Sequence, residues 1–398
     1  MIDNGTLFKI SQDFGTECFV FDADEVRKRA KEIKALLNEG LAKERAINLC
    51  FSIKANPFLI PVLMDSVDYF EVCSPGELSI CMAERVAPDK IIYSGVHKDE
   101  WDVEEAVKYG AKIITAESIL HYEIIKKVCG RLKKSANVIL RLSAGSQFGM
   151  SKEDIEYILE DAVKEGKSYV NLEGVHYFAG TQREKLKHQR RELEMLKEFM
   201  LELRNKYKMP LKWLEYGPGL PFNYFEGEIR EDTLMPLKEL LGDIKACTDE
   251  NDITIEMGRF LASSCGYYLT RIYDIKRSFD NNWCILGGGI NHVNYLGQMM
   301  GLKVPVIKFL SEDGADAAEE FSYTLCGSLC TTSDVLVREI KHKELKVGDI
   351  LCFTNIGAYS VTEGINLFLS RTMPKIIIFN SGKAEPVRDR IESWKLNH

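Results

Sequence analysis

The stretch AINLCFSIKAN, at residues 46–56, is a mostly apolar run that closes on a lysine, Lys54. Seven similar runs follow, and each ends in polar or glycine-containing sequence. Most segments between them have helical periodicity, as in residues 184–207, where apolar residues return at three, four or seven positions. The seven further runs are YFEVCSP (69–75), KIIYSGV (90–96), KIITAES (112–118), NVILRLSA (137–144), LEGVHYFAG (172–180), KWLEYGPG (212–219) and ITIEMGR (253–259).

Strands that alternate with helices indicate a parallel sheet. Eight such units in one stretch of chain predict a (β/α)8 barrel, whose active site lies at the C-terminal ends of the strands. An open doubly wound sheet has the same alternation, but the count of eight favours the barrel.

The pattern changes after residue 260, where short strand-like runs follow one another with turns and little helical periodicity. The run TECFVFDADEV, at residues 16–26, passes from strand-like to helical sequence, so the first strand is a candidate for the same β domain. We therefore expect a barrel at residues 25–258 and an all-β domain made of residues 1–24 and 259–398.

Composition excludes several classes of protein. The net charge is −8 and no long lysine or arginine stripe occurs, which argues against nucleic-acid binding. No run of eighteen apolar residues and no basic, apolar leader occur, so we expect a cytoplasmic protein without a membrane partner. The eleven cysteines are scattered without metal-ligand spacing, which indicates reduced thiols and no metal site.

Polar residues close each strand of the expected barrel and should converge on one site. A lysine in a desolvated site is a usable amine nucleophile, and the neighbouring arginines and glycines suit an anionic cofactor. For His176 two interpretations stay open, a packed strand-end histidine or a site residue. The converging residues are Lys54, Glu71, Arg141, His176, Gly217, Gly219, Glu256 and Arg259.

Seven motifs resemble, in order and spacing, the fold-type III pyridoxal-phosphate decarboxylases, the family of diaminopimelate and ornithine decarboxylases. The resemblance covers nearly the whole chain. It implies a barrel with a β domain, pyridoxal 5'-phosphate as cofactor, and a homodimer with shared active sites. The motifs are FSIKANPF (51–58), FEVCSPGEL (70–78), GVHYFAGTQ (174–182), EYGPGLP (215–221), IEMGRFLASSCGYYLTRI (255–272), LCGSLCTTSDVL (325–336) and GAYS (357–360).

The same resemblance implies roles for single residues. Lys54 would hold the cofactor as an imine, and Glu256 would pair with the pyridine nitrogen and keep it protonated. Glu71 and Arg141 would flank the imine side of the ring. The phosphate would lie among Arg259, Gly219, Thr181 and Tyr359.

Cys330 matches the family cysteine that reaches across the dimer interface and protonates the substrate carbon after decarboxylation. Asp334 would help to position the loop that carries Cys330. The substrate-binding positions by this resemblance are Arg259, Thr331, Tyr295, Asp334 and Tyr359.

The sequence departs from the family at several positions. Phe178 replaces the histidine that stacks on the cofactor ring, and Pro218 in the phosphate loop has no N–H to donate. Thr331 stands where diaminopimelate and ornithine decarboxylases have an acidic residue. Tyr295 stands at the position where diaminopimelate decarboxylases have an arginine. Neither standard substrate keeps its distal contacts, and unpaired charges are costly.

These departures favour an α-amino acid with a neutral or conjugated far end, free or tethered to a carrier. They place the chain nearer to decarboxylases of siderophore and aminoglycoside biosynthesis. The first alternative is a diaminopimelate, ornithine or lysine decarboxylase. Alternatives of another kind are an amino-acid racemase, a non-catalytic pyridoxal-phosphate-binding protein, and a regulatory homologue that has lost activity.

Overall fold

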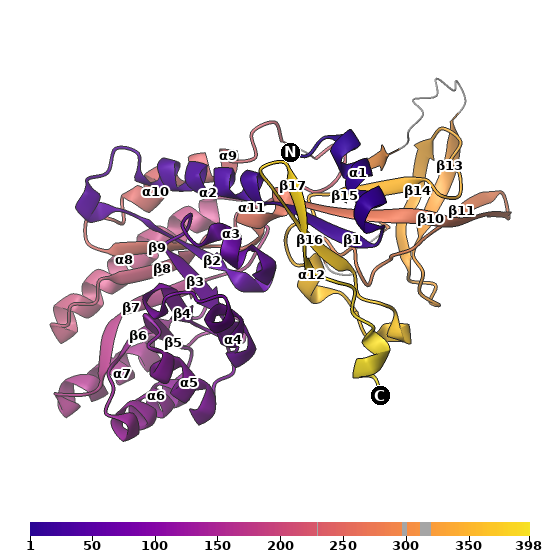
Figure 1. The fold of residues 1–398 in the computed structure, drawn as a ribbon. Coiled ribbons are helices and arrows are strands. Elements are labelled where there is room, and N and C mark those ends of the chain that lie inside the picture. Colours follow the sequence, from indigo (N-terminus) through magenta and orange to yellow (C-terminus); the bar gives the residue numbers. More distant parts are fainter. Residues whose placement is uncertain (229, 297–300, 311–319) are drawn as a thin grey trace. The chain divides into compact units, whose positions relative to one another are not determined.

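Eight parallel strands close into a barrel, as the repeated apolar runs predict (Figure 1). The structure is a computed structural model that describes residues 1–228, 230–296, 301–310 and 320–398. Strand β9 pairs with β2, with Cys50 opposite Glu256, and this pairing completes the ring. The strands are β2 (Asn48–Ser52), β3 (Tyr69–Val72), β4 (Ile91–Tyr93), β5 (Ile113–Ala116), β6 (Ala136–Arg141), β7 (Val170–Phe178), β8 (Trp213–Gly217) and β9 (Asp252–Met257).

The barrel strands read as apolar runs because side chains cover both of their faces. Strands β4 and β5 are buried at every residue. Cys50, Ile92, Ile113 and Ile139, from four different strands, contact one another in a single cluster. Residues of non-adjacent strands meet in this way only inside the ring, so the barrel is a filled core and not a pore.

Helices follow most barrel strands and lie around the ring (Figure 1). Side chains cap the starts of α4, α5, α6 and α7, and in α5 and α7 a capping box satisfies two backbone groups at once. Ser74 caps α4, in which Pro75 is the first residue. The helices are α2 (Ala23–Asn38), α3 (Ile60–Leu63), α4 (Pro75–Ala83), α5 (Glu100–Tyr109), α6 (Ile119–Leu132), α7 (Lys152–Glu165), α8 (Lys187–Tyr207), α9 (Met235–Lys238), α10 (Leu241–Lys245) and α11 (Arg259–Ala262).

The chain divides into two compact units. The barrel unit comprises Arg29–Pro221 and Asp232–Phe260. The β unit comprises Met1–Lys28, Phe222–Glu231 and Leu261–His398. Within the described residues, no helix is long and apolar enough to cross a membrane.

The described part of the β unit contains a nine-stranded sheet. The short strand-like runs after residue 260 form strands, as expected. Strand β17 and the first helix, α1 (Asn4–Phe14), were not expected. The remaining elements are β1 (Cys18–Asp22), β10 (Gly266–Ser278), β11 (Asn281–Leu286), β12 (Ile307–Leu310), β13 (Phe321–Cys326), β14 (Val335–His342), β15 (Ile350–Thr354), β16 (Lys375–Asn380), β17 (Lys383–Arg388) and α12 (Ser360–Glu363).

Strand β1 lies in the interior of this sheet. It pairs antiparallel with β10 and parallel with β16, and all five of its residues are buried. Helix α1 begins at the cap Asp3, whose carboxylate accepts from Thr6 N at 2.9 Å, and it packs Leu7 and Ile10 onto the same core. Strand β1 therefore lies in the same sheet as β10 and β16.

Substitutions at two separate glycines test the tight packing of the barrel. A Cβ at Gly174 would lie 1.8 Å from the carbonyl oxygen of Trp213 on the paired strand, so we expect Gly174→Ala to lower the free energy of unfolding by at least about 3 kcal/mol. Gly130, in helix α6, has open space around it, and Gly130→Ala should raise stability by about 0.5–1 kcal/mol. Urea unfolding measures both effects. Equal urea midpoints for Gly174→Ala and the parent chain would contradict the close packing of Gly174 against Trp213.

Candidate active site

Lys54 follows strand β2 in a short 3-10 turn, Ile53–Ala55. Ile53 and Ala55 on either side of it are buried, which fixes the backbone, while the lysine side chain is 41% exposed. Its Nζ lies 2.6 Å from Glu71 Oε2 and 3.4 Å from Cys73 Sγ. The amine therefore stands at the C-terminal end of the barrel beside a buried carboxylate.

Glu71 is held from two sides. It lies in β3, the neighbour of β2, with Ser52 opposite it in register. The Cys73 thiol lies 3.2 Å from its Oε1, and burial raises the pKa of Cys73 well above its ordinary value. Cys73 thus stays a protonated donor and leaves the nucleophilic role to the lysine. Cys73 was not among the predicted site residues.

Glu256 lies in β9 beside His176 of β7. The Nε2 of His176 is 3.4 Å from Glu256 Oε2, and both side chains are buried. His176 is thus both packed at the strand end and in contact with Glu256, and both interpretations of it stay open. Between these strands, β8 adds Glu215, a fully buried carboxyl that the sequence reasoning missed. Its signal was a charged residue inside an apolar run.

The loops after β7 and β8 are joined to each other. Gly219 has a φ of +59°, and a Cβ there would lie 1.8 Å from the carbonyl oxygen of Gly180. Arg183 N donates to Gly219 O at 2.9 Å. Thr181 is exposed in the first of these loops. The two loops form a backbone-lined ledge at the end of the barrel.

Phe178 ends β7 and rests against the bare backbone of Gly217, which is its partner in register. A Cβ at Gly217 would lie 2.6 Å from the Phe178 ring and 3.1 Å from Glu256 Oε2. The glycine therefore gives the ring its position.

Arg141, at the end of β6, forms a buried ion pair that sequence reasoning missed. Its Nη1 donates to Glu117 Oε1 at 2.8 Å, and its guanidinium lies 4.7 Å from the centre of the Phe148 ring. Lys98, also missed, is buried nearby and donates to Gly95 O. Burial lowers the pKa of Lys98 to about 8, against the opposing charge of Glu117.

Arg259 begins α11, just beyond β9, and is buried. Because β9 pairs with β2, Arg259 and Lys54 follow neighbouring strands at the same end of the barrel. The barrel unit thus carries at one end the expected site residues Lys54, Glu71, Arg141, Phe178, Thr181, Gly219, Glu256 and Arg259.

Asp334 accepts from Ile290 N at 2.8 Å and from Leu329 N at 2.7 Å. A Cβ at Gly289 or at Gly327 would lie within 2.3 Å of its carboxylate. Asp334 therefore ties the Cys330 loop to the segment after β11.

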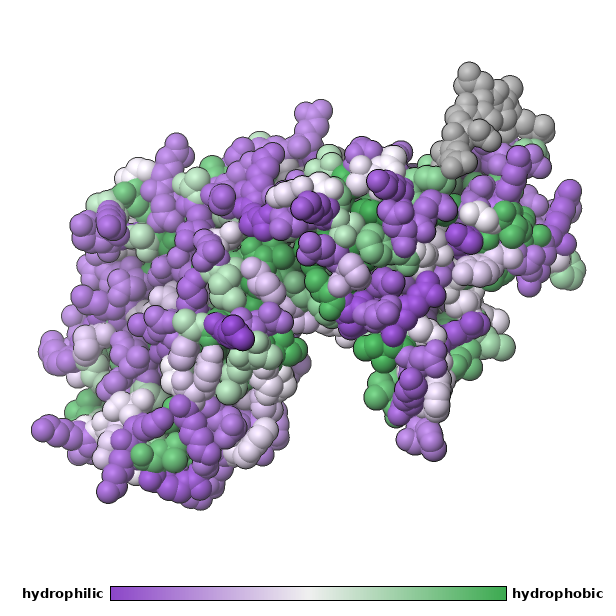
Figure 2. All heavy atoms as spheres, in the orientation of Figure 1, coloured by the Kyte–Doolittle hydropathy of each residue, from purple (hydrophilic) through white to green (hydrophobic). Residues whose placement is uncertain are grey.

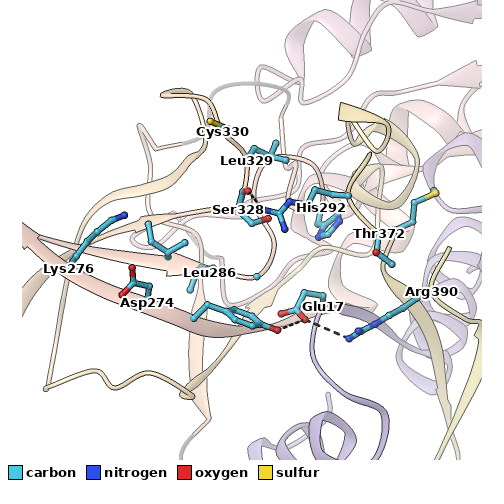
Figure 3. A pocket seen from close by; sticks show the side chains of 16 residues that line it. Glu17, Asp274, Lys276, Leu286, His292, Ser328, Leu329, Cys330, Thr372 and Arg390 are labelled. Atoms are coloured by element: carbon cyan, nitrogen blue, oxygen red, sulfur yellow. Dashed lines mark hydrogen bonds and ion pairs between the residues drawn. The ribbon is translucent and has the colours of Figure 1, made fainter. Parts of the chain in front are cut away.

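Cys330 is exposed at the rim of a cavity of about 600 Å³ in the β unit (Figure 3). Charged side chains line this cavity, and Arg390 lies 3.7 Å from Glu17 within it. Arg371 donates to Ser328 O at 2.7 Å, next to the Cys330 loop. The thiol is thus accessible on a loop that polar contacts hold in place.

The three remaining positions differ in exposure. Thr331 is partly buried, and its hydroxyl accepts from Ser333 N at 3.3 Å. Tyr295 is buried and donates its hydroxyl to Thr354 O at 2.8 Å. Tyr359 has a φ of +67°, a conformation that is strained for a tyrosine, and precedes α12.

A family model described as the pyridoxal-binding domain of pyridoxal-dependent decarboxylases matches residues 23–263. The L-glutamyl-[BtrI acyl-carrier protein] decarboxylase of Niallia circulans is 24% identical over 97% of this chain and 94% of that protein. The 2-[(L-alanin-3-ylcarbamoyl)methyl]-2-hydroxybutanedioate decarboxylase of Staphylococcus aureus is 25% identical over 84% of this chain and 88% of that protein.

Solved structures share the fold. Diaminopimelate decarboxylase of M. jannaschii in complex with L-lysine superposes with a TM-score of 0.86 at 21% identity. The match covers 98% of this chain and 93% of that one. The expected barrel with a β domain is confirmed.

Lys98 predicts a pH dependence of stability. The folded pKa, about 8, lies below the ordinary lysine value, so the unfolded chain binds more protons between these pH values. The contribution of Lys98 to the free energy of unfolding therefore rises as pH increases through this window. Relative to Lys98→Met, the parent chain should gain about 1–3 kcal/mol between pH 7 and pH 10.

Urea unfolding at several pH values measures this gain. The exposed Lys164, changed to Met, is the control and should show no such trend. A constant difference between the Lys98→Met variant and the parent chain would show that Lys98 does not titrate in this window.

Proposed function

The chain belongs to the family of pyridoxal-dependent decarboxylases, and we propose that it removes the α-carboxylate from an amino acid whose far end is neutral or conjugated. One observation carries this proposal. The Lys54 amine stands 2.6 Å from Glu71 at the C-terminal end of the barrel, and the buried Glu256 lies on β9, which pairs with the strand before Lys54. A reactive amine and a buried acceptor thus lie at the same end of the barrel, where enzymes of this fold place their active sites.

The residues present fit pyridoxal phosphate. Among the described residues, Glu256 Oε1 is a buried acceptor without a hydrogen-bond partner, which suits a ring N–H. The positive φ of Gly219 and its contact with Gly180 leave no room for a side chain in the backbone ledge, which suits a phosphate. When bound, the cofactor accepts the electrons released as carbon dioxide leaves.

The side chains of the barrel unit divide the work of holding this group. Lys54 supplies the amine for covalent attachment, and Glu71 orients that amine. Glu256 accepts from the ring nitrogen, and Phe178 covers the ring with an aromatic face that cannot donate a hydrogen bond. Arg141 would complete the ring side, while Gly219, Thr181 and Arg259 would receive the phosphate.

We propose that the chain works as a homodimer in which Cys330 of one copy returns a proton to the reacting carbon in the other. The exposed thiol and the loop held by Asp334 support this role. Apolar side chains at the surface of the C-terminal segment support association (Figure 2). They belong to two segments joined by the Asn397 to Leu367 O bond and comprise Ile365, Leu367, Phe368, Leu369, Ile391, Trp394 and Leu396.

The substrate is inferred from two positions. Thr331 offers a hydroxyl instead of a charge, and the Tyr295 hydroxyl is engaged by Thr354 O, so neither supplies the ionic contact that a distal ammonium or carboxylate needs. A conjugated far end, free or carrier-bound, avoids this penalty. The names of the Niallia circulans and Staphylococcus aureus relatives, which are decarboxylases of conjugated amino acids, support this choice.

We also retain residues 25–258 as the extent of the pyridoxal-phosphate domain and propose a cytoplasmic location. All eleven cysteines are free thiols, which agrees with a reducing compartment.

Replacing Lys54 tests the attachment of the cofactor. Lys54→Ala should abolish the absorbance of cofactor that stays on the protein after borohydride reduction and dialysis, because no other amine stands beside Glu71 in the described residues. Decarboxylation should fall at least about 1,000-fold with it. The exposed Lys164→Ala is the control. Retained cofactor absorbance in Lys54→Ala would remove the assignment.

A substrate panel tests the reaction. We expect carbon dioxide release from conjugated α-amino acids, such as amides and thioesters of glutamate, with kcat/KM at least about tenfold above that for free diaminopimelate, ornithine or lysine. The readout is labelled carbon dioxide together with the chirality of the recovered amino acid. Preference for a free dibasic substrate would overturn the substrate inference, and racemisation without carbon dioxide would overturn the reaction.

A further inference from the structure

Glu215 is a buried carboxyl that none of the proposed roles uses. It lies in β8, in register with His176 of β7 and Thr254 of β9, and its side chain is completely buried. Its Oε2 accepts a hydrogen bond from Trp213 Nε1 at 3.2 Å. A buried carboxyl either pairs with a cation or stays neutral, because an isolated charge is costly to bury.

The imidazole of His176 is already engaged by another carboxylate. One oxygen of Glu215, one oxygen of Glu256 and one ring nitrogen of His176 all lie within 4.8 Å of one another. His176 Nε2 is 3.4 Å from Glu256 Oε2. The cluster therefore has two carboxyl groups for one imidazole.

The surrounding strands add no spare positive charge among the described residues. Strand β3 contributes Glu71, whose negative charge also acts on Glu215. Lys54 lies 2.6 Å from Glu71, and its positive charge also acts on Glu256. Strand β2 contributes Cys50, a fully buried thiol whose pKa burial raises well above its ordinary value.

The hydrogen bonds of this cluster leave two buried acceptors unsatisfied within the described residues. In the described part of the chain, neither Glu215 Oε1 nor Glu256 Oε1 has a hydrogen-bond partner. Two ionised carboxylates would repel each other and leave both oxygens unsatisfied. A single proton on one carboxyl makes that group a donor to the other, and because a carboxylate oxygen can accept more than one hydrogen bond, Glu256 can still accept from the ring N–H of the cofactor.

The proton belongs on Glu215. Burial and the charge of Glu256 raise the pKa of Glu215 well above its ordinary value. Burial acts in the same direction on Glu256, but the adjacent imidazole of His176 outweighs it and lowers the pKa of Glu256. The two carboxyls thus differ because only one of them has the histidine.

We propose that Glu215 is a positioning residue that, as a neutral carboxylic acid, donates a hydrogen bond to Glu256 and holds it as the carboxylate that faces the cofactor ring nitrogen. This inference rests on the proposed role of Glu256. Trp213 fixes the acid from the other side, so the acceptor is oriented before the cofactor arrives and needs no reorganisation.

Two substitutions distinguish the proposed hydrogen bond of Glu215 from the volume that its side chain fills. Glu215→Gln keeps a donor toward Glu256 and an acceptor for Trp213, and should bind pyridoxal phosphate within about twofold of the parent chain. Glu215→Leu removes both and should weaken cofactor affinity about tenfold, since a hydrogen bond to a charged group is worth about that much. The control is Glu173→Gln, a partly buried glutamate on β7 outside the cluster.

A measurement on the cofactor-free protein detects the proton directly. Infrared spectra of chains with isotope-labelled glutamate should show the C=O band of a protonated carboxylic acid at pH 7. The band should be absent from Glu215→Gln and present in Glu173→Gln. A band that survives in Glu215→Gln would overturn the proposal, as would a stoichiometric divalent cation in the purified protein that is lost in that variant.

Failure of the role of Glu256 has a different signature. If Glu256→Gln binds cofactor as the parent chain does, Glu256 does not face the ring and the proposed function loses that assignment. If Glu256→Gln weakens binding while Glu215→Leu does not, only the positioning role of Glu215 is overturned.

Discussion

The barrel unit depends on ion pairs between the charged side chains at the ends of its apolar strands. Ionisable groups at the strand ends are taken out of water by the filled core beneath them, so each needs a partner. Adjacent strands supply two of these pairs, Lys54 with Glu71 and Arg141 with Glu117, at 2.6 Å and 2.8 Å. The third pair, His176 with Glu256, spans β8, and this geometry brings Glu215 between them. The strand order therefore determines which charges meet.

Much of this arrangement could be predicted from the sequence, because parallel strands place their polar closing residues at one end. The apolar runs identified the eight barrel strands, and the motifs identified Lys54 and Glu256. Partners such as Glu117 and Lys98 were missed because pairing depends on register and side-chain direction, which a single strand's pattern does not contain. Glu215 was missed for a related reason, since an isolated glutamate in an apolar run does not reveal its neighbours on β7 and β9.

The departures from the family have a physical basis in the structure. Phe178 in place of a histidine comes with a glycine, Gly217, that leaves space for the larger ring. Pro218 removes one backbone donor, and the ledge is instead held by Arg183 N on Gly219 O and by Gln189 on Pro218 O. In the β unit, the Tyr295 hydroxyl donates to Thr354 O, and its ring packs against the rings of Tyr224 and Phe225.

The interior position of β1 has a consequence for how the chain folds as it is made. Cys18–Asp22 pairs with Lys375–Asn380, so β1 cannot complete its pairing until residues 375–380 have been made. Seven of the eight barrel pairings join strands that follow one another in sequence, and β9, which closes the ring on β2, ends at Met257, well before Lys375. Closing so long a loop is slow, and the unpaired apolar strand is exposed to wrong partners in the meantime. The β sheet is therefore the last part of the molecule to form, and the barrel that carries the lysine can be finished before it.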